Sequence, residues 1–322
     1  MIITEAGCTV YPIVVPTPRS LRTFNFYLLE EAGSLTLIDA GVNSEECWTA
    51  FLTAMAVNRL AMKDLDRIIV THSHQDHIGI INRITFDHDI PIYAHHESLH
   101  RLKRDRDFLQ FRIQFFGELY ESLGCGDLGL QQVEKLKEAA SMNEHRIAGD
   151  IVPLYDGDTF ADMQVIETLG HSPDHIALYN RERQWLFAGD LMIGHMSSSA
   201  LIEPDQFGRR TPSLIQHVAS LQKCLQLPMV KVFSGHGEPI YLYKELISKR
   251  LQHIYRRVNR IWQLVASGIS MPSELGMALY KNLYISDFPF VMAEIIGCLD
   301  YLEMQNKVGK KRIGQVWHYF VF

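Results

Sequence analysis

The segment THSHQDHIG, residues 71–79, constrains this chain more than any other part of its sequence. It places three imidazoles and one carboxylate, those of His72, His74, Asp76 and His77, within six consecutive positions. Neutral imidazole and carboxylate groups are ligands of zinc, iron and manganese. A chance match to this pattern is rare in a chain with 15 histidines among 322 residues. The segment therefore predicts a metal site rather than a polar surface loop.

The residues before this segment predict a rigid support for it. LDRIIV, residues 65–70, is typical of a buried strand, so the histidines follow a strand in a loop that leads into a helix. The short β-rich runs 24–30 and 34–39, separated by EAG, predict a hairpin. Further strands are expected at 91–95, from residue 152 onward and at 231–237, and helices at 43–60 and 212–226.

Residues 97–147 interrupt the strand pattern with two helical segments. Apolar residues recur there at helical spacing, as in Phe108, Phe111 and Phe115. An insertion of this size between two strands predicts a lid or pocket wall. A plain packing layer is the alternative.

The last 82 residues differ in charge and pattern from the rest. Helices are expected at 244–267, from about Pro272, and at about 287–305, followed by a basic hairpin. Three helices and a hairpin resemble a winged helix. Residues 241–322 carry 11 Lys or Arg against 6 Asp or Glu, a net of +5, while residues 1–240 carry −11. This asymmetry favours either an anionic partner of the tail or a solvated basic helix face.

The five cysteines are scattered and never form a CxxC pair, which argues against a disulfide framework and a cysteine zinc site. The start, MIITEAGCTV, has neither the basic nor the apolar region of a signal peptide. No apolar run reaches the length of a membrane span. We therefore expect a cytoplasmic protein with reduced thiols and no membrane partner. The oligomeric state is left open.

Further candidate ligands follow other predicted strands. They are Asp39 in LIDAG, His171 in GHS, Asp190 in FAGD and His236 in SGHG. Each lies beside a glycine or close to one, which lets the backbone turn tightly near a ligand. A lone GH or GD pair more often marks a turn than a ligand. The order of these segments around THSHQDH favours ligands over turns at these positions.

These segments, in this order over residues 39–236, resemble the five core motifs of the metallo-β-lactamase-fold hydrolase superfamily. The resemblance is to its dinuclear members of the glyoxalase II and β-lactamase-like-protein-2 type. It implies an α/β fold, a four-layer αββα sandwich. We expect a catalytic domain at residues 1–240, containing the helical insertion, and a small winged-helix-like domain at residues 241–322.

The resemblance also implies a role for each ligand. The first of two divalent cations would be bound by His72, His74 and His171, and the second by Asp76, His77 and His236. Asp190 would bridge them. Asp76, Asp190 and Asp39 are the candidate catalytic carboxylates, with Asp39 behind the ligands, orienting either one of them or the bridging water. Zinc is the first expectation, and manganese and iron accept the same ligand types.

Two details narrow the resemblance. The bridging residue is Asp190 rather than cysteine, which disfavours the antibiotic-hydrolysing lactamases that use a cysteine ligand. The third motif reads GHSPDH, with Asp174 where related enzymes commonly carry glycine. His175 is expected either to reach the rim of the site or to be a hydrogen-bonded structural residue. His195 is a second candidate substrate contact.

The expected reaction is hydrolysis of an ester, thioester or lactone carbonyl by a hydroxide held between two metals. A small acyl or lactone substrate would fit a pocket covered by the apolar insertion. The alternative is a phosphodiesterase or endoribonuclease that binds single-stranded RNA through the basic hairpin, with Lys307, Lys310, Lys311 and Arg312. A binding module with a degenerate site is a third interpretation, disfavoured by the complete ligand set.

Overall fold

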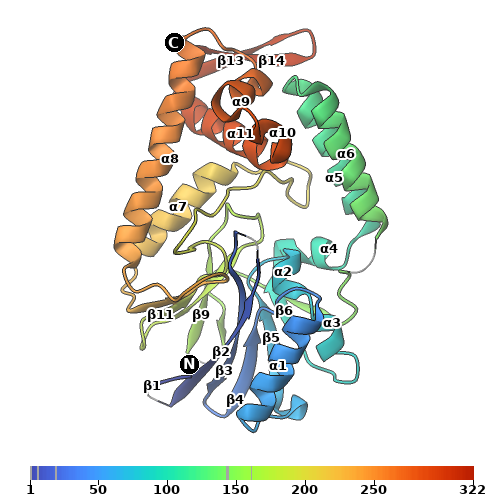
Figure 1. The fold of residues 1–322 in the computed structure, drawn as a ribbon, viewed down its shortest axis with the longest axis vertical. Helices are drawn as coiled ribbons and strands as arrows, with labels where there is room; N and C mark the ends of the chain where they lie inside the picture. The colour runs from blue at the N-terminus through green and yellow to red at the C-terminus, as the bar shows by residue number, and fades with distance from the viewer. Residues whose placement is uncertain (1, 6, 19, 143–144, 161) are drawn as a thin grey trace.

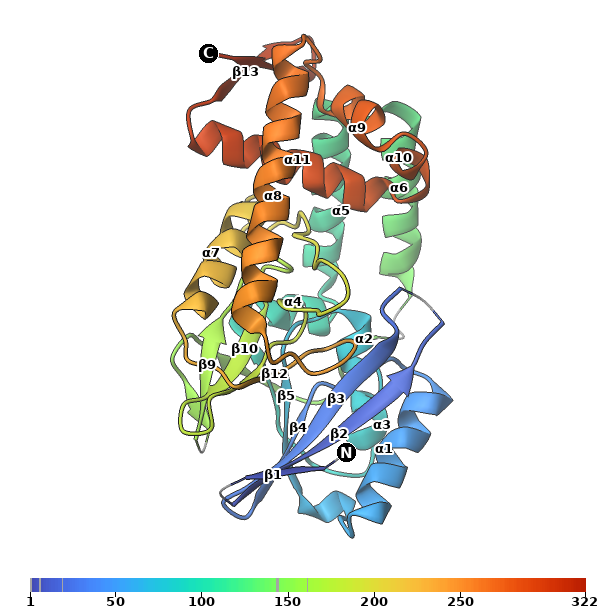
Figure 2. The same cartoon turned by 60° about the vertical axis from the view of Figure 1, so that its left-hand side comes forward.

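Two β-sheets lie face to face and carry helices on their outer faces (Figure 1). The computed structural model describes residues 2–5, 7–18, 20–142, 145–160 and 162–322. The order of layers is helix, sheet, sheet, helix, which confirms the predicted αββα sandwich. The C-terminal helices stand beyond one end of this sandwich in both views (Figures 1 and 2).

The first sheet combines a meander with parallel strands. In the described residues its order is β1 (Ile3–Glu5), β2 (Cys8–Pro16), β3 (Thr23–Glu31), β4 (Ser34–Ile38), β5 (Leu65–Val70), β6 (Ile92–His95) and β7 (Ile151–Leu154). Neighbours from β1 to β4 are antiparallel, which confirms the predicted 24–39 hairpin. Neighbours from β4 to β7 are parallel, so their carboxyl ends meet at one edge of the sheet.

The second sheet brings its strand ends to the same edge. Its order is β12 (Lys231–Phe233), β11 (Trp185–Phe187), β10 (Ile176–Asn180), β9 (Met163–Glu167) and β8 (Thr159–Phe160). β11 and β12 are parallel, and β9 runs in their direction because both β9 and β11 are antiparallel to β10. The loops after β9, β11 and β12 therefore leave the sheet together.

Aromatic rings fill the space between the sheets. Tyr27 of the first sheet packs edge-on against Phe187 and Phe233 of the second, with ring centroids 5.4 Å apart in both pairs. Phe187 and Phe233 stack on each other at 4.5 Å. All three side chains are buried, so this contact fixes how the two sheets, and the loops at their common edge, face each other.

Helices cover both outer faces. The first sheet is covered by α1 (Glu45–Val57), with the short α2 (Gln75–Ile78), α3 (Ile81–Ile84) and 3₁₀ turns η1 (Met62–Asp64) and η2 (His96–Ser98) beside it. The second sheet is covered by α7 (Ser213–Leu225) and α8 (Tyr243–Ala266). The α8 stripe predicted from Ile247 to Val265 is buried along its length. That burial joins the C-terminal part of the chain to the sandwich.

The helical insertion forms a long antiparallel pair. The pair consists of α5 (Arg106–Ser122) and α6 (Gly126–Ser141), and the short α4 (Leu99–Leu102) precedes it. The pair stands beside the C-terminal helices in both views (Figures 1 and 2), and Tyr120 of α5 contacts Phe288 with ring centroids 5.1 Å apart. The predicted insertion is therefore helical, and its far end packs against the C-terminal helices.

The C-terminal residues fold as expected in outline. They form α9 (Pro272–Tyr280), a short α10 (Leu283–Ser286), α11 (Phe288–Met304) and the hairpin β13 (Val308–Ile313) and β14 (Val316–Val321). The winged-helix resemblance and a domain division at residue 240 stay predictions. One hydrophobic core runs across that position, from α5 and α7 to α8 and α11. Helices α11 and α7, from the two sides of residue 240, pack closely. A Cβ at Gly297 of α11 would lie 2.8 Å from the side chain of Leu214 of α7.

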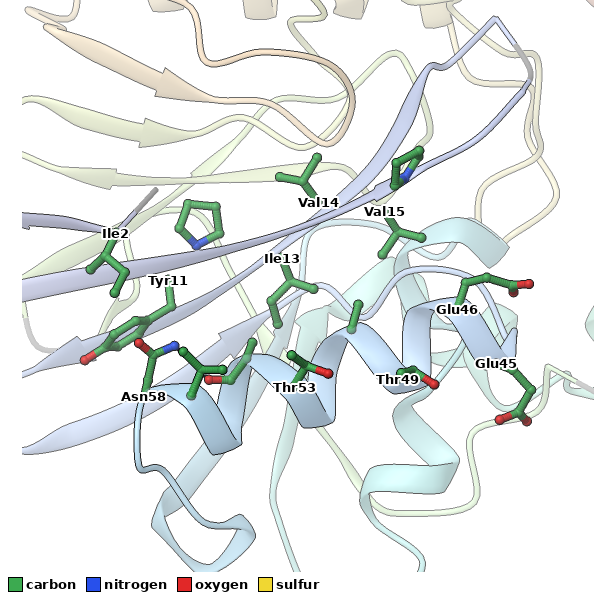
Figure 3. Close-up of a pocket in the computed structure, with 15 residues that line it drawn as sticks. Ile2, Tyr11, Ile13, Val14, Val15, Glu45, Glu46, Thr49, Thr53 and Asn58 are labelled. Carbon is green, nitrogen blue, oxygen red and sulfur yellow. The ribbon is translucent and has the colours of Figure 1, made fainter.

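Strand β2 is an element that the sequence patterns did not single out. Pro12 and Pro16 lie within it, and proline lacks the N–H that a ladder needs. The structure places both on an edge strand, since β1 pairs only as far as Val10. Beside it, a groove of about 740 Å³ lies between β2 and α1, lined by Ile13, Val14 and Thr53 among others (Figure 3).

The sequence predicted reduced thiols and no membrane-spanning segment. Cys8, Cys47, Cys125, Cys224 and Cys298 are free thiols, and each is buried. No helix among the described residues is both long and apolar enough to cross a membrane.

The continuous core predicts that the two parts of the chain unfold together. Leu299 on α11 is fully buried in this core, so Leu299→Ala should lower the free energy of unfolding by about 2–5 kcal/mol. Met304→Ala, at an exposed position of the same helix, should cost much less. Urea unfolding followed by tryptophan fluorescence and by far-ultraviolet circular dichroism should give one shared transition. Two separated transitions would contradict a single core.

Candidate metal centre

The predicted ligands meet where the strand ends of both sheets converge. Asp39 follows β4, and the histidines of residues 72–77 follow β5 and enter α2. His171, Asp190 and His236 follow β9, β11 and β12. Because these ends share one edge, residues up to 197 positions apart come into proximity. The fold thus supplies the proximity that the sequence motifs could only suggest.

Three histidines form one half of the cluster. His72 Nε2 lies 2.9 Å from His74 Nδ1, and His171 Nε2 lies 3.0 Å from the same atom. His72 is completely buried and His171 nearly so. Burial and, after it, neighbouring imidazoles lower the pKa of His74 to about 4 and that of His72 well below its usual range. His72 and His74 are therefore neutral, the form that binds a cation.

Asp190 joins this half to the other. Its Oδ2 lies 3.5 Å from His171 Nε2, while Oδ1 lies 3.3 Å from His77 Nε2 and 3.2 Å from His236 Nε2. Asp76 Oδ2 lies 3.4 Å from His236 Nε2. The two oxygens of one carboxylate thus face two different groups of nitrogens.

Several of these buried atoms contact one another as ion pairs but form no hydrogen bond. In the part of the chain that the structure describes, His77 Nε2, His236 Nε2 and Asp190 Oδ1 are buried without a hydrogen bond. A buried polar atom without a hydrogen bond is costly, and these three lie in the groups of side chains that could hold a cation. Imidazole nitrogens and carboxylate oxygens suit a divalent cation. The residues therefore fit the metals that the sequence motifs imply.

Outer contacts aim the rings. His236 Nδ1 donates to the carbonyl of Thr23 at 2.7 Å, and His171 Nδ1 donates to that of Ser199 at 2.8 Å. Such bonds direct Nε2 at the centre and leave it free to bind a cation. Asp39 does the same for His77, with Oδ2 2.8 Å from Nδ1. Asp39 thus lies behind His77, its other side-chain contacts are to Thr71, and its orienting role stays a prediction.

Glycine is required at one point of this packing. A Cβ at Gly235 would lie 2.6 Å from Asp190 Oδ1 and 2.8 Å from His77 Cε1. The SGHG motif therefore provides both a ligand and the space beside it.

The two ends of the cluster differ in protonation. Burial alone would lower the pKa of His236, but the carboxylates of Asp190 and Asp76 raise it to about 9. Asp39 and Asp190 raise the pKa of His77 in the same way, against the effect of burial. Paired with these rings, the carboxyls of Asp76 and Asp190 keep pKa values below their usual range despite burial. In the metal-free protein, protons on the two imidazoles thus balance the acidic charge.

The expected substrate contact by His175 is wrong. This side chain is fully buried, with Nδ1 2.7 Å from Thr168 Oγ1, and its Nε2 accepts a bond from the backbone N–H of Asp190 at 3.0 Å. Both nitrogens are used, so His175 supports the backbone of the bridging residue, as the structural alternative predicted. His195 bonds to the carbonyl of Ser20 at 3.0 Å, and its contact with substrate stays a prediction.

Asp174 has a role that sequence reasoning missed. Its Oδ2 accepts from the backbone N–H of Ser73 at 3.0 Å and from Ser98 Oγ at 2.7 Å. It therefore ties the loop between His72 and His74 to the turn η2. The only sequence signal was the aspartate in GHSPDH.

A pocket of about 520 Å³ opens beside the cluster. His74, Asp76, His171 and Asp190 are among the residues that line it. The walls include Arg101, Arg104, Phe108 and Arg112 from the helical insertion and Glu203 and Phe290 from later segments. Sequence analysis predicted the insertion as a pocket wall but did not identify its charged residues. The run RLKRDR at residues 101–106 was the available signal.

Comparison with known proteins agrees with this geometry. The family model of the metallo-beta-lactamase superfamily matches residues 23–236. The chain belongs to the metallo-β-lactamase superfamily. Members of this superfamily are metal-dependent hydrolases, and this protein is one of them.

Individual relatives cover most of the chain. The probable metallo-hydrolase YqjP of Bacillus subtilis is 28% identical over 93% of each chain. A beta-lactamase-like protein 2 homolog of Caenorhabditis elegans is 26% identical over 76% of this chain and 66% of that protein. The crystal structure of a metallo-beta-lactamase family protein from Thermus thermophilus is similar with a TM-score of 0.77, at 25% identity over 97% of this chain and 98% of that one. The similarity to a superfamily member therefore includes the C-terminal helices.

The contact between Asp39 and His77 predicts an effect on metal affinity without loss of a ligand. Asp39→Asn keeps the size of the side chain but weakens the acceptor on His77 Nδ1, so metal affinity should fall about 10–100-fold. Competition with a chromogenic chelator measures it. Asp87→Asn makes the same charge change at an exposed position and is the control. Equal affinities for the two variants would refute the orienting role.

The raised pKa values predict that metal loading releases protons. At pH 7, His77 and His236 are protonated in the metal-free protein, and a cation displaces those protons, about two per site. Zinc titration calorimetry in buffers of different ionisation enthalpy measures this release. It should decline as the pH rises toward 9, where His236 loses its proton without metal. Heats that do not depend on the buffer would contradict this protonation state.

Proposed function

We propose that this protein is a dinuclear hydrolase of thioester or related carbonyl substrates. The observation that carries the two-metal proposal is the Asp190 carboxylate, whose Oδ1 faces His77 and His236 while Oδ2 faces His171. His72, His74 and His171 would hold one cation, and Asp76, His77 and His236 the other. Zinc fits these ligands best, and manganese and iron are the competing metals.

Two named relatives support carbonyl chemistry. A hydroxyacylglutathione hydrolase of Bdellovibrio bacteriovorus is 25% identical over 41% of this chain and 36% of that protein. The thioesterase pkgB of Emericella nidulans is 22% identical over 78% of this chain and 56% of that protein. Both names describe hydrolysis of a thioester. A small acyl substrate also suits a pocket with Phe108, Leu109 and Leu201 on its walls.

In the proposed hydrolysis, the carboxylates of the chain would orient the attacking water, and the buried histidines would hold the cations. When bound, a pair of divalent cations lowers the pKa of water toward neutrality and polarises the carbonyl oxygen. Asp190 and Asp76 stay ionised and can accept a hydrogen bond from the attacking water, which fixes its orientation. Asp76 lines the pocket, so the water would meet the carbonyl there. Burial of the histidines excludes bulk water from the far side.

A phosphodiesterase acting on single-stranded RNA has weaker support. Lys307, Lys311 and Arg312 are exposed, as that function requires, whereas Lys310 is engaged by Glu303 at 2.9 Å. However, the hairpin lies at the end of the molecule away from the sheets and α2 in both views (Figures 1 and 2). RNA would have to span that separation to connect the hairpin with the metal centre.

Loss of a bridging or terminal ligand should abolish turnover. Asp190→Ala and His72→Ala should each remove activity and lower bound metal per chain, because each deletes a ligand that no neighbour replaces. The measurements are metal analysis and a screen of thioesters, esters, lactones and phosphodiesters with the zinc-loaded protein. His88→Ala, at an exposed position, is the control. Full activity with stoichiometric metal in either variant would refute the ligand assignment, and hydrolysis of phosphodiesters alone would favour the nuclease.

A further inference from the structure

The pocket beside the metal centre has an excess of positive charge on one wall. Arg101, Arg104 and Arg112 line it together, all from the start of the helical insertion. Outside the metal ligands, the carboxylates among the described lining residues are Asp174 and Glu203. Three guanidinium groups therefore face two carboxylates, since arginine keeps its charge in proteins.

Glu203 is committed to Arg101 and Arg112, while Asp174 accepts hydrogen bonds from Ser73 and Ser98. Glu203 receives Arg101 Nη1 at 3.1 Å and Arg112 Nε at 2.7 Å on the same oxygen, and Arg112 Nη2 reaches its other oxygen. The charge of Arg101 also helps to hold the pKa of the buried Asp174 carboxyl below its usual range. Arg101, Arg112 and Glu203 therefore form one ion-pair network.

Arg104 is left outside this network. Its Nη2 donates to the backbone carbonyl of Ala139, and its Nε is buried without a hydrogen-bond partner. Among the described residues, the ion pairs of this wall are made by Arg101 and Arg112, and none is made by Arg104. Burial and the charge of Arg112 both lower the pKa of Arg104, which indicates that the two cations repel each other. An anion beside Arg104 would relieve that repulsion.

Apolar residues line the same pocket as Arg104 and the metal ligands. Ile78, Phe108, Leu109 and Leu201 are among them. A ligand that fills this space would present a polar group to the metals, an apolar chain to these side chains and its far end to the guanidinium. The planar guanidinium fork matches a carboxylate or phosphate.

We propose that the pocket selects substrates with an anionic group, a carboxylate or phosphate, at a distance from the scissile carbonyl, and that Arg104 binds this group. Here the reaction class rests on the proposed function, whereas the anion site rests on the pocket alone. The anionic group belongs either to the acyl chain or to the thiol that leaves. The chemistry recognised by Arg104 is the same in both cases.

A pair of matched thioesters tests selection during turnover. One carries a terminal carboxylate and the other a terminal carboxamide of the same length, placed in turn on the acyl chain and on the thiol. The zinc-loaded protein should prefer the carboxylate about 10–100-fold in kcat/KM in one of the two placements, as expected for a charge-assisted hydrogen bond. The placement that shows the preference identifies whether the acyl chain or the thiol of the substrate carries the anionic group.

Variants assign the preference to Arg104. R104M should abolish the carboxylate preference mainly through a higher KM for the anionic thioester, and R104K should restore part of it. R106M removes a charge from an exposed position at the start of α5, outside the pocket, and should keep the preference. A wild-type protein without preference in either placement, or an R104M variant that keeps it, would overturn the proposal.

A binding measurement separates this proposal from the proposed reaction. Dicarboxylates from succinate to suberate and their monoamides are titrated calorimetrically into the zinc-loaded protein and into R104M. The wild type should bind a diacid of one length at least about tenfold more tightly than its monoamide, and R104M should not. That result without thioester turnover would refute the hydrolase and retain the anion site. Thioester turnover with equal binding of diacids and monoamides would refute the anion site alone.

Discussion

The rest of the centre depends on the contacts between the buried carboxylate of Asp190 and the histidines around it. An ionised group in this position is unfavourable without polar partners, and the ring nitrogens of His77, His171 and His236, from three loops, lie 3.2–3.5 Å from its oxygens. Those loops can converge because strands of both sheets end at one edge. The aromatic contact of Tyr27 with Phe187 and Phe233 holds the sheets in that relation. Core packing and metal chemistry are thus parts of one arrangement.

The ligands were predictable because four of them are clustered in THSHQDH after a strand, while His171, Asp190 and His236 each follow a strand and lie beside a glycine, so local patterns carried the information. The αββα sandwich followed from the resemblance that these motifs support. Other features depend on partners that are distant in the chain. Asp174 binds Ser98, 76 positions away, and Glu203 binds Arg112, 91 positions away. Strand β2 was missed because its prolines contradict the usual composition of a strand.

The helical insertion serves as pocket wall and packing layer at once, which reconciles the two alternatives raised by its sequence. Its beginning supplies Arg104 and Phe108 to the pocket, while Tyr120, further along α5, packs against Phe288 of α11. The C-terminal helices therefore brace the wall from behind. A change in their packing would alter the shape of the substrate pocket without touching a metal ligand.

The prolines of β2 have a consequence for how copies of this protein meet. Beyond Val10, this strand is the outer edge of the first sheet, and an exposed edge can pair with a strand of another molecule. Pro12 and Pro16 offer no N–H to such a strand, which interrupts the ladder at two places. The sheet is therefore protected against growing by edge-to-edge association, a common route to aggregation. The same two residues that hid the strand from sequence analysis keep its open edge from recruiting neighbours.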